Sequence, residues 1–176
     1  MKSQYLLLLL CLLLLACQEN NNQQLPSIVL TPNSSYVSPE GNFEIFFPHK
    51  PLISSLEGQV QGQKVINYVF AYDSGKEKYA VNYADYPDSL SIDLEEIKQK
   101  GLQSMGEVSM NEEKQVSLGK YKGLQYQAQV KNGIAKAKVA GKIYLAGHRL
   151  YHISVFTHKE LPENTQTFLD SFVITK

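Results

Sequence analysis

Hydrophobic and polar residues alternate with a period of two along most of this chain, a pattern that is typical of half-buried β-strands. The segments that show it span residues 42–48, 65–72, 79–84, 108–118, 124–131 and 135–145. Residues 150–157 are apolar at successive positions, as expected of a strand in the middle of a sheet. Between two of the segments, Asn132-Gly133 predicts a tight hairpin turn. The pattern therefore predicts an antiparallel sheet of about six to seven strands.

Two other stretches show the spacing of amphipathic helices. The first begins after Asp93, a residue that is well suited to cap a helix N-terminus. The second begins near Pro162, and its apolar stripe contains Phe168, Leu169 and Phe172. We expect both stripes to pack on the sheet. The predicted fold class is therefore α+β, an antiparallel sheet with helices packed on it.

The first 16 residues have the features of a secretory signal. Lys2 precedes an apolar run from Leu6 to Leu15, which is shorter than the roughly 20 residues that a membrane-spanning helix needs. The run ends in Leu14-Leu15-Ala16-Cys17, which resembles the lipobox of bacterial lipoproteins. This resemblance implies cleavage before Cys17, attachment of diacylglycerol to its thiol and acylation of the new amino group. The alternative is an ordinary cleaved signal with an incidental cysteine.

The remaining chain divides into a tether and one domain. Residues 17–35 are polar and rich in Asn and Gln, and they contain two prolines, so they are predicted to form a flexible spacer behind the lipidated cysteine. Residues 36–176 are long enough for one domain, within which residues 56–64 are predicted to form a loop. In enterobacterial lipoproteins, Asp after the lipidated cysteine retains the protein at the inner membrane. By this resemblance Gln18 favours the outer membrane of the cell envelope, at its periplasmic or surface face, over the inner membrane.

Composition excludes several kinds of partner and site. The chain has 17 basic and 17 acidic residues, so it has no overall field that would attract nucleic acid. Cys11 would be removed with the signal and Cys17 would be lipidated, which leaves no thiol for a disulfide or a cysteine-based metal site. The chain has 11 Tyr, 7 Phe and no Trp, and this aromatic content also favours a sheet.

Several segments in order resemble proteins of the PsbP/Mog-type fold. These segments span residues 41–48, 79–83, 119–123, 142–145, 149–151 and 168–172. The resemblance would cover residues 36–174, and it implies an antiparallel sheet of about six to seven strands flanked by helices in an α/β/α sandwich. It implies no function, because members of this fold have unrelated partners.

The sequence shows no set of residues that is typical of a catalytic or metal site. His148 and His152 have the spacing of a helical metal pair, but they fall on a predicted strand, where four residues span about 13 Å. The chain contains neither a glycine-rich phosphate loop nor a nucleophile elbow. We therefore expect a protein that is not an enzyme and that holds no metal or cofactor.

Four lysines are the strongest candidates for a binding surface. They are Lys131, Lys136, Lys138 and Lys142, on two neighbouring predicted strands. Three of them share a face because their positions have the same parity. They could bind an anionic partner, either lipid headgroups or an acidic protein. The alternative is a solvated sheet face on which lysines protect an edge.

The sequence thus predicts a lipid-anchored, non-catalytic protein of the bacterial cell envelope. Its domain would be a monomer that binds or stabilises an envelope protein and does not bind nucleic acid. The competing hypothesis is a lipoprotein that binds a small ligand or a metal, or an unrecognised hydrolase. Its cleft would be lined by the tyrosines at 68, 72, 79, 83 and 126, although ordinary core packing also explains these residues.

Overall fold

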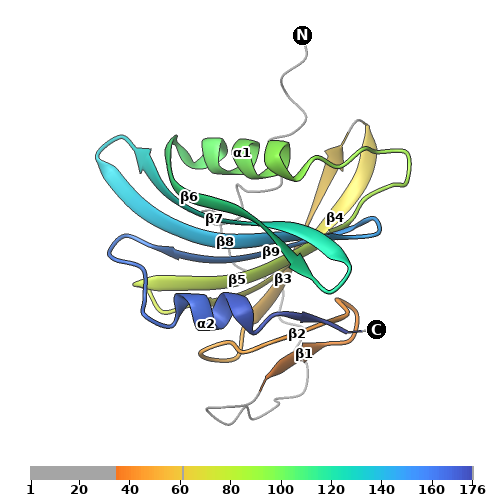
Figure 1. Ribbon diagram of the computed structural model, residues 1–176, viewed down its shortest axis with the longest axis horizontal. Coiled ribbons are helices and arrows are strands. Elements are labelled where there is room, and N and C mark those ends of the chain that lie inside the picture. The colour runs from red at the N-terminus through yellow and green to blue at the C-terminus, as the bar shows by residue number, and fades with distance from the viewer. Residues whose placement is uncertain (1–34, 61, 176) are drawn as a thin grey trace.

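The computed structural model describes residues 35–60 and 62–175 (Figure 1). In chain order the elements are β1 (Tyr36–Ser38), β2 (Phe43–Ile45), β3 (Leu52–Val60), β4 (Gln63–Asp73), β5 (Glu77–Asp85), α1 (Leu94–Met105), β6 (Glu107–Leu118), β7 (Tyr121–Asn132), β8 (Ala135–Ala146), β9 (Arg149–Thr157), α2 (Thr165–Asp170) and β10 (Val173–Ile174). The predicted signal, Cys17 and nearly all of the tether lie outside the described residues.

Seven strands form one antiparallel sheet in the order β3-β4-β5-β9-β8-β7-β6. Strand β9 joins the N-terminal strands β3–β5 to the C-terminal strands β6–β8, so it lies in the middle of the sheet. This position explains its continuous apolar sequence, because side chains on both of its faces are buried. The predicted hairpin at Asn132-Gly133 is confirmed, since β7 pairs with β8 up to Asn132 and Ala135.

The two faces of the large sheet are covered differently (Figure 1). Helix α1 lies on one face, over β7 and β8, with Leu102 and Met105 buried against the sheet. On the opposite face, the short helix α2 and a second sheet, of order β1-β2-β10, enclose an aromatic cluster. Phe43 and Ile45 of β2 are completely buried in this cluster. We call these two faces the α1 face and the α2 face.

The predicted α/β/α sandwich is wrong. Helix α2 has only 6 residues, and Phe172 lies beyond its end. The β-branched residues Val173 and Ile174 then pair with β2 instead of continuing a helix. A three-stranded sheet therefore covers much of the face that a second long helix would have covered.

The predicted loop at residues 56–64 is also wrong in large part. Residues up to Val60 belong to β3, which pairs with β4 along its whole length. Because β3 is an edge strand, most of its side chains are exposed, and its sequence does not show the alternation of a half-buried strand. Gly62, with a φ of +80°, lies in the turn that leads to β4.

The predicted start of the first helix is confirmed. The Asp93 side chain accepts hydrogen bonds from the backbone N–H groups of Glu95 (2.9 Å) and Glu96 (3.3 Å). An ion pair between the buried Lys98 and the exposed Glu113 of β6 also holds α1 against the sheet. The position of α1 is therefore fixed by apolar packing and by this ion pair.

We predict that Phe172→Ala destabilises the domain by about 3–5 kcal/mol, because it removes a buried ring and leaves a cavity. The measurement is the free energy of unfolding in urea. Val173→Ala is the matched control, since Val173 is the next residue along the chain and its exposed fraction is 49%. Similar losses of unfolding free energy in Phe172→Ala and Val173→Ala would contradict the burial of Phe172 in the aromatic cluster.

Candidate functional site

The four predicted lysines lie on one face of β7 and β8. Lys131 is paired with Lys136 across these strands, and Lys138 and Lys142 are paired with glutamines of β7. All four are on the α2 face. We call this surface, which also includes Gln125, Gln127 and Gln129, the lysine face.

Two of the four lysines have acidic partners within the domain. Lys142 is buried and forms an ion pair with Asp170 of α2, and Lys138 pairs with Glu160. Burial raises the pKa of Asp170, but hydrogen bonds from Lys142 and Gln166 outweigh this effect and lower the pKa. These contacts attach α2 and the preceding segment to the large sheet, so a structural role accounts for Lys138 and Lys142.

Lys131 and Lys136 lie instead at the exposed end of the β7–β8 hairpin. Between them, at the tip, is Ile134, whose exposed fraction is 102%. On the other neighbouring strand, β6, Glu107 is paired with Lys131 and offsets part of its positive charge. We call the segment from Lys131 to Lys136 the hairpin tip; it combines an apolar side chain with two exposed cations.

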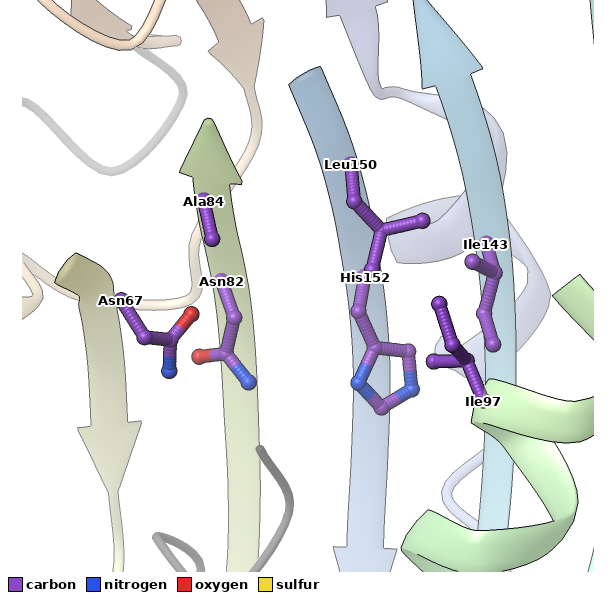
Figure 2. A pocket seen from close by; sticks show the side chains of 7 residues that line it. All are labelled: Asn67, Asn82, Ala84, Ile97, Ile143, Leu150 and His152. Atoms are coloured by element: carbon purple, nitrogen blue, oxygen red, sulfur yellow. The ribbon is translucent and has the colours of Figure 1, made fainter. Parts of the chain in front are cut away.

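A second candidate is a small buried polar pocket on the α1 face (Figure 2). Asn67 of β4, Asn82 of β5 and His152 of β9 line it, and each is at most 5% exposed. Ile97 of α1 covers it, and Ala84, Ile143 and Leu150 complete an apolar wall. The cavity has a volume of about 10 Å³.

Three polar atoms of this pocket have no hydrogen-bond partner among the described residues. They are Asn67 Nδ2, Asn82 Oδ1 and His152 Nδ1. In Figure 2 the two amides face each other, and the imidazole lies across from them beside Ile97. One donor atom, Asn67 Nδ2, and one acceptor atom, Asn82 Oδ1, are therefore buried without a partner in side chains that line the same pocket.

The imidazole of His152 is held in place by Tyr126 of β7. The Tyr126 hydroxyl lies 2.8 Å from His152 Nε2. Burial lowers the pKa of His152 to about 4 and raises the pKa of Tyr126. Both side chains are consequently neutral at pH 7, and the pocket carries no charge.

The structure separates the other residues that the sequence singled out. His148 is exposed in the β8–β9 turn, with Nδ1 2.7 Å from Asp88 Oδ1, whereas His152 is buried in β9. Tyr126 lies on the α1 face, and the other tyrosines proposed for a cleft pack in or against the cluster on the α2 face. The five tyrosines therefore do not line one cleft.

Residues 35–60 and 62–175 contain no group of three or more His, Cys, Asp or Glu side chains that could hold a metal ion. In the same part of the chain, no helix is long and apolar enough to cross a membrane.

Sequence reasoning missed Asn67 and Asn82. A signal was present, because Asn67 has the same parity as Val65 and Val69, which are buried in β4. A polar residue at an inward position of an apolar stripe is unusual and indicates a special environment. The pattern does not show that two such residues on separate strands lie together.

No protein-family model matches this sequence, and no curated protein matches it. Among solved structures, the chain is similar to PA94 of Pseudomonas aeruginosa, a protein of unknown function, with 3% identity and a TM-score of 0.38, covering 58% of this chain and 82% of that one. It is also similar to LpqN of Mycobacterium tuberculosis, which is involved in cell envelope biogenesis. That likeness has 12% identity and a TM-score of 0.41, and it covers 76% of this chain and 83% of LpqN. Likenesses of this extent carry no conclusion about the function of this chain.

We predict that acid destabilises this domain partly through His152. Its pKa is about 4 in the folded protein and about 6.5 when unfolded, so below pH 6.5 the unfolded state binds a proton that the folded state does not. The contribution of neutral His152 is fully present above pH 6.5 and is lost as the pH falls toward 4. It amounts to roughly 3 kcal/mol.

The measurement is the free energy of unfolding in urea at pH 7 and pH 4, for the wild type and for His152→Gln. The carboxylates contribute equally to both proteins, so the difference between the two pH dependences isolates His152. The wild type should lose more stability than the variant. Equal losses of unfolding free energy in the wild type and in His152→Gln would show that His152 is not buried in its neutral form.

Proposed function

We propose that this chain is a lipid-anchored, non-catalytic protein of the bacterial cell envelope that binds an anionic envelope protein through the hairpin tip. Lipid on Cys17 would hold it in the membrane, and Gln18 favours the outer membrane. The observation that carries the binding proposal is the position of Ile134 between two exposed lysines.

The hairpin tip contributes little to the stability of the isolated domain. Like charges directly opposite each other on neighbouring strands are destabilising, and this is the arrangement of Lys131 and Lys136. An exposed isoleucine gains no burial energy. Both features become favourable on contact with a partner that offers carboxylates around an apolar patch, because the lysines gain ion pairs and the isoleucine is buried.

The proposed lipid anchor would favour such a contact. Two or three acyl chains hold a protein stably at a membrane, whereas one chain holds it marginally. A protein confined to the membrane meets other envelope components at a high local concentration, so that a small contact such as the hairpin tip is sufficient.

We predict that Cys17→Ala abolishes lipid attachment. The wild type should incorporate a labelled fatty acid and partition into detergent, because Cys17 is the expected acceptor. The variant should do neither and should either keep its signal or be released from the membrane. A processed variant that still partitions into detergent would disprove the proposed anchor.

We predict that Lys131→Glu combined with Lys136→Glu lowers recovery of the crosslinked partner from intact cells at least about tenfold, since each lost ion pair costs binding energy. Lys120→Glu combined with Lys122→Glu is the control, because these exposed lysines lie in the turn before β7 and at the start of β7, at the end of the strand opposite to the hairpin tip. Recovery of the crosslinked partner with this control variant should equal its recovery with the wild type. Equal recovery in both double variants would contradict a role for the hairpin tip.

A further inference from the structure

The polar residues that line the buried pocket determine which chemical group can occupy it. Polar atoms that are withdrawn from water without a partner destabilise a fold. Here Asn67, Asn82 and His152 of three strands line one cavity. Each has one buried polar atom, Nδ2, Oδ1 and Nδ1 respectively, without a partner among the described residues. Apolar residues would have filled this space at lower free-energy cost. The pocket is therefore suited to hold a polar group.

The directions of the hydrogen bonds define that group. Asn67 Nδ2 donates and Asn82 Oδ1 accepts, so one occupying atom must accept from the first and donate to the second. A hydroxyl oxygen does both. A carboxylate cannot donate, an ammonium cannot accept, and either charge would be costly beside neutral, buried side chains.

The size of the cavity limits the occupant further. A volume of about 10 Å³ is at the lower limit of the roughly 10–15 Å³ that one water molecule needs. A larger molecule fits only with its hydroxyl end in the cavity and with Ile97 displaced. Tyr126 keeps the imidazole in position, because its hydroxyl occupies His152 Nε2 and leaves Nδ1 directed to the pocket.

We propose that this pocket binds a single hydroxyl group through Asn67, Asn82 and His152. The hydroxyl belongs either to an internal water or to one end of a small neutral alcohol. This inference is independent of the anchor and of the hairpin tip.

The test uses the full mature chain purified from its own host. Magnetic relaxation dispersion of water counts long-lived internal waters, and native mass spectrometry detects a bound alcohol. Both are applied to the wild type, to Asn82→Leu and to Asn67→Leu. Ser154→Ala is the matched control, because Ser154 is buried in β9, its hydroxyl also has no partner among the described residues, and it does not line the pocket.

Loss of one long-lived water in both leucine variants, but not in the Ser154→Ala control, identifies the occupant as water. An adduct of the mass of an alcohol on the wild type, absent from both leucine variants, identifies the alcohol. The proposal is overturned if wild type and variants show the same water count and no adduct. A high-resolution structure in which Asn67 Nδ2 donates directly to Asn82 Oδ1 also overturns it, and this requires no variant.

Discussion

The packing of Phe172 between the two sheets is the interaction on which the rest of this structure depends. Its ring lies 5.7 Å from that of Phe43 in β2, and 6.2 Å and 5.3 Å from those of Tyr144 and Tyr151 in the large sheet. Strands β1, β2 and β10 have only 3, 3 and 2 residues, too few to form a stable sheet alone. They persist because Phe43 and Phe172 anchor them, with the Tyr151 hydroxyl donating to the Gly41 carbonyl at 2.8 Å.

This packing divides the molecule into regions with different chemistry. The aromatic cluster and α2 close the central part of the α2 face, and the polar side chains of β7 and β8 remain at its side as the lysine face. On the opposite face, α1 covers β7 and β8, and its Ile97 reaches over β9 to close the buried pocket. A rigid sheet that is closed in this way presents the hairpin tip without a large entropic cost on binding.

The local features of this chain could be predicted from its sequence because they depend on neighbouring residues. The alternation in β7 and β8, the Asn132-Gly133 turn and the Asp93 cap are set by short-range chemistry. The parity rule also placed Lys136, Lys138 and Lys142 on one face, whereas the register of β7 against β8 adds Lys131 to it. The features that were missed depend on contacts between distant segments: β3 is an exposed edge strand without alternation, and Val173 pairs with Glu44 of β2. The pocket needs Asn67, Asn82 and His152 together, and no short window of sequence contains all three.

Site-specific photocrosslinking in living cells tests most directly whether the hairpin tip contacts a partner in the envelope. A photoreactive amino acid replaces Ile134 at the tip or, as a control, Lys76 in the exposed β4–β5 turn. We expect one discrete adduct from position 134, composed of this chain and an acidic envelope protein, and none from position 76. No adduct from position 134, or the same adduct from both positions, would contradict this contact.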